Sequence, residues 1–157
     1  MELSIIFLPL IASIISGFFG KFIGDRNSEI VTSVLVSISA LLSIFVLYQV
    51  IANQYEENIV IAKWINSGSL NVNWSMLIDP LSAVMLVVVT SISSLVHIYS
   101  IGYMSHDPHK PRFMAYLSLF TFAMLMLVTS DTFIQFFFGW ECVGLCSYFL
   151  IGFWFKK

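Results

Sequence analysis

Five apolar segments dominate the sequence, and each is long enough to cross a lipid bilayer as a helix. At about 1.5 Å per helical residue, ~17–25 residues span a hydrocarbon core of ~30 Å. Hydropathy and helix breakers place the segments at about Leu3–Ile23, Ile30–Ala52, Asp79–Ile101, Phe113–Thr129 and Thr132–Phe155. The sequence therefore predicts an all-α integral membrane fold with five transmembrane helices.

The composition supports a membrane protein. Hydrophobic residues make up 59% of the chain and charged residues 10%, with a mean hydropathy of +0.92, whereas a soluble domain carries roughly 25% charged residues. The net charge of −2 is confined to short connections, and no basic patch indicates nucleic acid. Glu2 and a long apolar run favour a retained first span over a secretory signal. Without a linker or a repeat, residues 1–157 form a single membrane domain.

Short polar motifs mark the ends of the predicted spans. Asp25-Arg26-Asn27 forms a polar break after the first span. Asp79-Pro80 is typical of a helix start, with Asp as the N-cap and Pro at the first helical position. Asp131 is a candidate cap for the fifth helix.

The distribution of basic residues predicts the orientation. With the N-terminus outside and the C-terminus inside, the outer connections hold only Lys63. The other six basic residues lie at inner ends or in inner connections: Lys21, Arg26, Lys110, Arg112, Lys156 and Lys157. This asymmetry follows the positive-inside rule.

The long outer connection, at about residues 57–77, has the period of a β-strand in its second half. Apolar and polar residues alternate from Leu70 to Met76, and Ile59–Ile65 is rich in β-branched residues. Asn66-Ser67-Gly68-Ser69 is a plausible turn between them, so we expect an outer-face β-hairpin. The alternative is a loop that enters the interface through Trp64 and Trp74, since Trp favours that depth.

Glu141 falls near the middle of the fifth predicted span, and no other acid or base lies inside a predicted span away from its ends. An ionisable group at this depth costs roughly 2.5–3.5 kcal/mol on insertion scales, so it is a candidate functional residue. Desolvation favours a neutral carboxyl group and a nearby cation favours the charged form. Glu141 could therefore bind and release protons; alternatively, it is a neutral hydrogen-bonding group between helices.

Small residues surround Glu141. Gly139, Cys142 and Cys146 form a stripe on a neighbouring face, and Gly144 lies near the Glu141 face. Small residues allow close helix packing in lipid, so we expect Glu141 to point into a helix bundle.

Other candidates for chemistry are weaker. His97 lies near the inner end of the third span and is a possible proton relay, or a hydrogen-bonded packing residue. His106 and His109 sit in an inner loop with two prolines, so we expect no metal site there. The sequence contains no phosphate-binding loop, haem motif, iron–sulfur spacing or flavin fingerprint, and we expect no cofactor in this chain.

The segment Gly139–Trp154, read as GWECVGLCSYFLIGFW, closely resembles the signature of a respiratory family. This is the distal antiporter-like membrane subunit (chain 5 or chain L) of NADH:quinone oxidoreductase, complex I. The stretch His97–Tyr116, Asp79-Pro80-Leu81-Ser82 and Ser130-Asp131 look like the same family. The departure is Cys142, where the family pattern has a small Gly, and the small face remains intact.

The resemblance implies a proton-translocating subunit in which Glu141 matches an essential glutamate. That glutamate is thought to couple to a lysine on a later helix. FMN, iron–sulfur clusters, NADH and quinone are then expected in other subunits, with membrane-arm subunits and lipids as partners. The location would be the mitochondrial inner membrane or the bacterial plasma membrane.

Family members are several hundred residues longer and contain many more helices. This sequence resembles their N-terminal portion and lacks the partner lysine, so we expect the chain alone to transport nothing and to hold Glu141 protonated. Alternative functions are the large subunit of a multi-subunit cation/proton antiporter and a structural membrane scaffold.

Overall fold

The computed structural model describes residues 1–53, 56–68 and 70–154. It confirms five helices long and apolar enough to cross a membrane, together with a two-stranded hairpin. The elements are α1 (Glu2–Ile23), α2 (Asp25–Asn53), β1 (Glu57–Ser67), β2 (Leu70–Ile78), α3 (Pro80–Tyr103), α4 (Lys110–Val128), α5 (Phe133–Ile151) and a short 3-10 turn, η1 (Gly152–Trp154).

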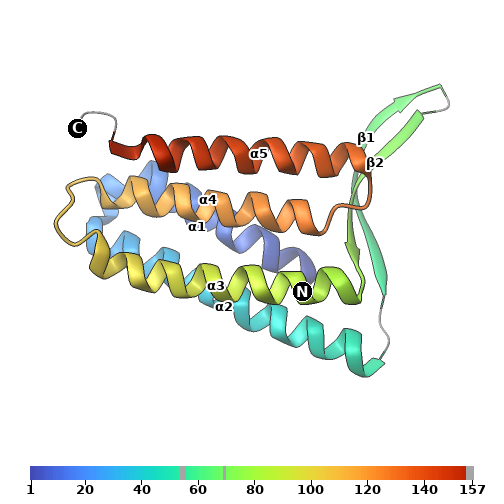
Figure 1. Cartoon of the computed structure of the whole chain (residues 1–157), viewed down its shortest axis with the longest axis horizontal. Helices are drawn as coiled ribbons and strands as arrows, with labels where there is room; N and C mark the ends of the chain where they lie inside the picture. Colours follow the sequence, from blue (N-terminus) through green and yellow to red (C-terminus); the bar gives the residue numbers. More distant parts are fainter. Residues whose placement is uncertain (54–55, 69, 155–157) are drawn as a thin grey trace.

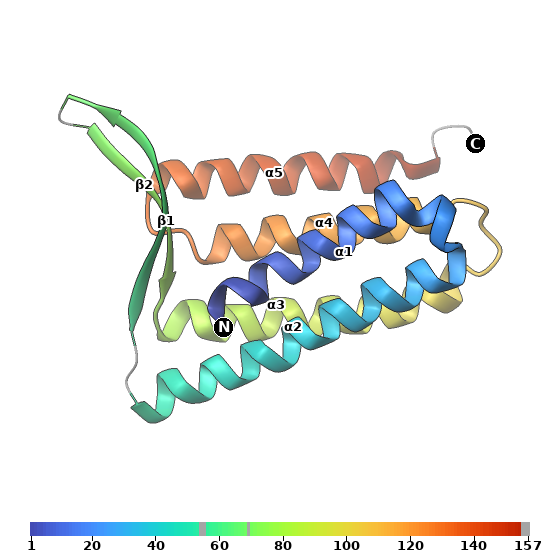
Figure 2. The same ribbon diagram turned by 180° about the vertical axis from the view of Figure 1, so that it is seen from behind.

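The helices lie side by side with the hairpin across one end of the bundle (Figure 1). The α1–α2 turn and the α3–α4 connection lie at the opposite end, as the reverse view also shows (Figure 2). The N-terminus lies toward the hairpin end and η1 lies at the other end, as an odd number of spans requires (Figures 1 and 2). Which end faces the outside stays a prediction from the basic residues.

The turn between α1 and α2 is tighter than predicted. Gly24 has a φ of 88°, a left-handed conformation that glycine adopts without steric cost, and α2 begins at the next residue. The predicted polar break at Asp25-Arg26-Asn27 is therefore wrong: these residues form the first turn of α2, where an acid such as Asp25 is favoured by the helix dipole. Asn27 also donates from its side-chain amide to the Ile23 carbonyl at 3.0 Å.

The start of α3 confirms the predicted cap. The Ser82 backbone N–H donates to the Asp79 carboxylate at 2.7 Å, and the Asp79 N–H donates to the Ser82 hydroxyl at 2.9 Å. These reciprocal bonds form a capping box. The hydrogen bonds from the Ser82 backbone and side chain lower the pKa of Asp79 below its ordinary value of 3.8.

The fifth helix begins differently from the prediction, in which Asp131 was its cap. Thr132 is the N-cap, and its hydroxyl accepts from the Gln135 N–H at 3.3 Å. Asp131 instead accepts hydrogen bonds from Asn58 (2.8 Å) and the Ser75 hydroxyl (3.0 Å) of the hairpin. The Asp131 carboxylate thus binds the hairpin, a tertiary contact, and does not cap α5 as its position in the sequence predicted.

The predicted hairpin is confirmed in place of the loop alternative, while its location on the outer face stays a prediction. β1 and β2 pair antiparallel, with irregularities between Val60 and Ala62 and between Lys63 and Ile65. Gly68 in the connection has a φ of 58°, which suits a tight turn. The predicted turn also included Ser69, which lies outside the described residues.

Small hydroxyl residues hold the helices together alongside an apolar core. The hydroxyls of Ser43 and Thr90 are hydrogen-bonded at 2.8 Å between α2 and α3, and Ser13 donates to the Ala115 carbonyl at 2.9 Å between α1 and α4. Lipid gives helices no hydrophobic driving force to associate, so close packing and such bonds do that work. The fully buried apolar side chains include Ile5, Ile6, Val36, Val46, Leu86, Met114 and Leu125.

Candidate functional site

Glu141 lies near the middle of α5, as predicted from its depth, but its side chain is exposed. We expected it to point into a helix bundle, and within this chain it does not. The reason is the position of α5 at the edge of the bundle, where its main helical neighbour is α4 (Figures 1 and 2). Glu141 therefore belongs to a face of α5 that the helices of this chain leave uncovered.

The face of α5 that contacts α4 carries small residues. Gly139 is buried, and a Cβ atom built on it would lie 2.9 Å from the Leu127 Cα. Cys146 is also buried and Cys142 is half-buried. Gly144 differs, because a Cβ there would meet nothing within 4 Å. Because α5 packs closely on α4 through these small residues, the neighbouring face of α5, which carries Glu141, points away from α4.

A hydrogen-bonded contact with the hairpin fixes the start of α5. The Gln135 side chain is buried, donates to the Ser75 carbonyl at 2.7 Å and accepts from the Ser75 N–H at 3.1 Å. The Leu77 N–H donates to the Thr129 carbonyl at 2.9 Å in the α4–α5 turn. The hairpin therefore holds both the turn and the first helical residues, about two turns before Glu141.

Aromatic side chains add to this contact. The Phe138 ring lies edge-on to Trp74 (5.0 Å between centroids) and to Trp64 (5.9 Å). These two tryptophans also contact each other at 4.8 Å. Such pairs contribute about 0.5–1.5 kcal/mol each beyond their area burial. The hairpin is thus attached to the same helix that carries Glu141.

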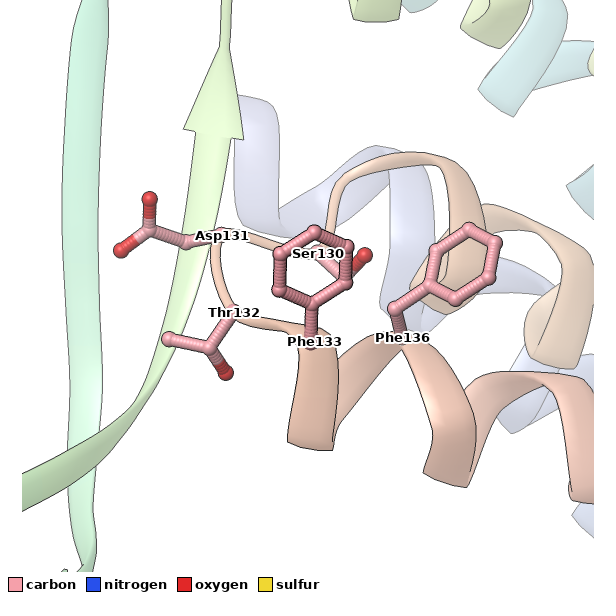
Figure 3. Close-up of a pocket in the computed structure, with 5 residues that line it drawn as sticks. All are labelled: Ser130, Asp131, Thr132, Phe133 and Phe136. Carbon is pink, nitrogen blue, oxygen red and sulfur yellow. The ribbon is translucent and has the colours of Figure 1, made fainter.

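A small cavity of about 160 Å³ opens beside the α4–α5 turn. Figure 3 shows Asp131 directed toward the hairpin strands, with the rings of Phe133 and Phe136 on the other side of the turn. Because Asp131 already accepts two hydrogen bonds from the hairpin, this cavity serves the attachment of the turn and offers no separate reactive group.

His97 is fully buried between α3 and α4. Its Nδ1 lies 2.7 Å from the Ser93 carbonyl, which can only accept, so Nδ1 carries a proton. Its Nε2 lies 2.9 Å from the Ser118 hydroxyl and accepts from it in the neutral ring. Since α4 lies between α3 and α5 (Figure 1), the structure does not bring His97 to Glu141.

Glu29 is a buried acid that the sequence analysis missed. Its side chain is 5% exposed, and Oε1 lies 3.9 Å from the Lys110 Nζ of α4. Oε1 accepts no hydrogen bond from the residues that the structure describes. The prediction that no acid besides Glu141 lies inside a span is therefore wrong, because Glu29 lies within α2. Gly24 was the sequence signal that could have placed Glu29 inside the second helix, because a glycine can end the preceding helix in a single residue.

The match of residues 130–157 to a family model places the chain among antiporter-like integral membrane proteins. That model is described as NADH:quinone oxidoreductase/Mrp antiporter, TM. Residues 64–114, which include most of the hairpin, α3 and the start of α4, match the model described as NADH-Ubiquinone oxidoreductase (complex I), chain 5 N-terminus. The chain belongs to the chain 5 family of complex I.

Curated relatives agree with this assignment. NADH-ubiquinone oxidoreductase chain 5 of Phytophthora infestans is 54% identical over 155 residues, which are 99% of this chain and 23% of the relative. The proteins of the same name from Arabidopsis thaliana and Triticum aestivum are each 55% identical over the whole chain, covering 24% and 23% of their lengths. The chain spans about a quarter of the length of these relatives.

Proposed function

We propose that this chain forms the N-terminal portion of a membrane-arm subunit of proton-pumping NADH:quinone oxidoreductase, in which Glu141 binds and releases a translocated proton. The membrane is the mitochondrial inner membrane or the bacterial plasma membrane. The observation that carries the proposal is the position of Glu141, at midspan on the face of α5 that this chain leaves uncovered.

A carboxyl group on such a face requires a polar partner. If this face lay against acyl chains, the charged form of Glu141 would raise the free energy of membrane insertion by at least ~2.5 kcal/mol, the insertion-scale value for an acid at a helix centre. Further helices of the subunit would cover this face of α5, and a lysine on one of them would serve as the partner. When that cation approaches, the charged form of Glu141 is favoured and a proton leaves; when it withdraws, the carboxyl group takes up a proton.

The electron-transfer groups belong to other subunits in this proposal. FMN, iron–sulfur clusters, NADH and quinone are held elsewhere in the complex. This chain contributes the Glu141 carboxyl group and the rigid attachment of α5 to α4 and to the hairpin. A fixed position matters because the coupling between two charges falls with their separation.

The test is the Glu141→Gln variant of the whole subunit assembled in its complex. Glutamine has a similar size and can form hydrogen bonds, but its amide group does not take up or release a proton. NADH-driven proton pumping in sealed vesicles is expected to fall severely, while the variant complex still assembles on a native gel. Glu141→Asp, which keeps the titratable group, is the matched control and is expected to retain part of the pumping. Full pumping by Glu141→Gln would contradict the proposal and leave Glu141 a packing residue of a membrane scaffold.

A second candidate is the large subunit of a multi-subunit cation/proton antiporter. The observation that favours it is the match of residues 130–157 to a family model that also covers Mrp antiporters. A native gel of mildly solubilised membranes, probed for this chain and stained for NADH dehydrogenase activity, separates the two. Co-migration with that activity supports the respiratory complex, and a large band without it supports the antiporter.

A further inference from the structure

We propose that a pocket between α4 and α5, at the end of the bundle opposite the hairpin, binds the phosphate of an anionic phospholipid headgroup. The pocket has a volume of about 290 Å³. Its lining combines one guanidinium group, two phenol rings and two phenylalanine rings: Arg112, Tyr116, Tyr148, Phe149, Gly152 and Phe153. This inference is independent of the role proposed for Glu141.

Arg112 supplies the positive charge and retains unused donors. One terminal nitrogen donates to the Phe153 carbonyl at 3.1 Å, and the guanidinium carbon lies 4.7 Å from the centre of the Phe153 ring. Its Nε makes no hydrogen bond to any residue that the structure describes. A guanidinium group has five N–H donors in a fixed fork that suits phosphate oxygens. These contacts orient the group and leave donors for a ligand.

No carboxylate within the described part of the chain forms an ion pair with Arg112, whereas Lys110 lies 3.9 Å from Glu29. Arg112 is half-buried, and none of the described residues supplies a counter-charge to it. A buried or half-buried charge is stabilised by a counter-ion, and a phosphate would provide one at this position.

The depth of the pocket suits a headgroup. Helix α4 has 19 residues, about 28 Å at ~1.5 Å per residue, which matches the hydrocarbon core. Arg112 lies in the first turn of α4, and Gly152 and Phe153 follow the end of α5, so the pocket sits at the membrane boundary. Basic pockets between transmembrane helices at this depth bind lipid headgroups, and tyrosines concentrate there.

The remaining lining favours a lipid over a soluble anion. Tyr116 and Phe149 stack with their ring centres 5.4 Å apart, so the pocket wall toward the hydrocarbon is aromatic. Such a wall accommodates the first methylenes of an acyl chain, while the phenol hydroxyls of Tyr116 and Tyr148 can donate to phosphate oxygens. A free phosphate would use the charge but not the aromatic wall.

The test measures lipid selectivity of the full chain in phosphatidylcholine vesicles. Spin-labelled phosphatidylglycerol and spin-labelled phosphatidylcholine are compared by the motionally restricted fraction of their electron paramagnetic resonance spectra. We expect a preference for phosphatidylglycerol that falls about fivefold in Arg112→Gln, the factor for one basic residue near a lipid phosphate. Arg26→Gln removes the same charge from an exposed site at the same end of the bundle but outside the pocket, and it is expected to lower the preference less than Arg112→Gln does.

The proposal is overturned if the chain shows no preference, if Arg112→Gln keeps it, or if inorganic phosphate displaces the lipid, which would indicate a site for a soluble anion. Should Arg112→Gln not insert into vesicles, Tyr148→Phe decides the matter. Tyr148 is exposed, so the loss of one hydroxyl leaves the helix packing intact. A lower preference in that variant supports the pocket, and an unchanged preference excludes it.

Discussion

The close approach of α5 to α4 at Gly139 predicts that Gly139→Ala separates the two helices. A Cβ atom there would lie 2.9 Å from the Leu127 Cα and 3.1 Å from the Leu127 Cβ and N. Carbon atoms pack best at about 3.5–4.0 Å, so the helices would have to move apart by roughly 0.6–1.1 Å. The obstacle is mainly backbone, and no change of rotamer relieves it.

The expected cost follows from overpacking and from lost contact along the seam. A gap of ~0.5–1 Å forfeits about a quarter to a half of the attraction of each contact, and inserted methyl groups typically cost about 1–3 kcal/mol. The unfolding equilibrium should therefore shift roughly 5- to 150-fold. Detergent-induced unfolding in mixed micelles, followed by far-ultraviolet circular dichroism, measures this shift.

Gly144→Ala is the matched control, because a Cβ at Gly144 meets nothing within 4 Å and the residue lies on the same helix. We expect that variant to unfold like the native chain. If Gly139→Ala were as stable as Gly144→Ala, the small-residue stripe would not set the α4–α5 distance, and close packing at Gly139 would not explain the outward direction of Glu141.

Three further predictions concern polar contacts. Gln135→Leu removes the side-chain partner of the Ser75 N–H and carbonyl and should cost about 1–3 kcal/mol, seen as faster hydrogen exchange at Ser75 than in the conservative Gln135→Asn. Lys110→Ala leaves the Glu29 carboxylate unpaired and should destabilise the chain by about 1–3 kcal/mol, whereas the double variant with Glu29→Gln should recover most of that loss in detergent unfolding. The cap at Asp79 stabilises α3 above its ordinary pKa of 3.8 and loses this contribution as the pH falls through its lowered pKa. The protection of the first-turn amides of α3 against hydrogen exchange, relative to their intrinsic rates, should therefore fall in acid.

Each of these has an outcome that would contradict it. Equal exchange at Ser75 in both Gln135 variants would mean that the hairpin is held by other contacts. Equal stability of Lys110→Ala and the double variant would show that an unpaired Glu29 charge is not the cause of the loss. An Asp79→Ser variant keeps a cap that does not titrate; the same acid response there would assign the effect to another group.

Sequence patterns predicted the helices and strands best where interactions between neighbouring residues set their positions. Asp79-Pro80 starts a helix because the cap and the proline act within one turn, and the structure shows that capping box. The alternation from Leu70 to Met76 predicted a strand, which the hairpin confirms. Hydropathy does not predict a helix boundary that a single residue sets: Gly24 ends α1 so abruptly that Glu29 falls inside α2.

The sequence by itself determined the class of fold, because five apolar segments in a chain with few charges can bury their backbone polar groups only as membrane helices. It also placed Glu141 near the middle of the fifth helix, since position along a helix depends only on residue count. The direction of Glu141 was decided by tertiary structure: Gly139 packs on Leu127, so the face that carries Glu141 turns away from α4. The Glu29–Lys110 pair and the Gln135–Ser75 contact likewise join residues 81 and 60 positions apart, and no local pattern encodes which distant partner a polar group will meet.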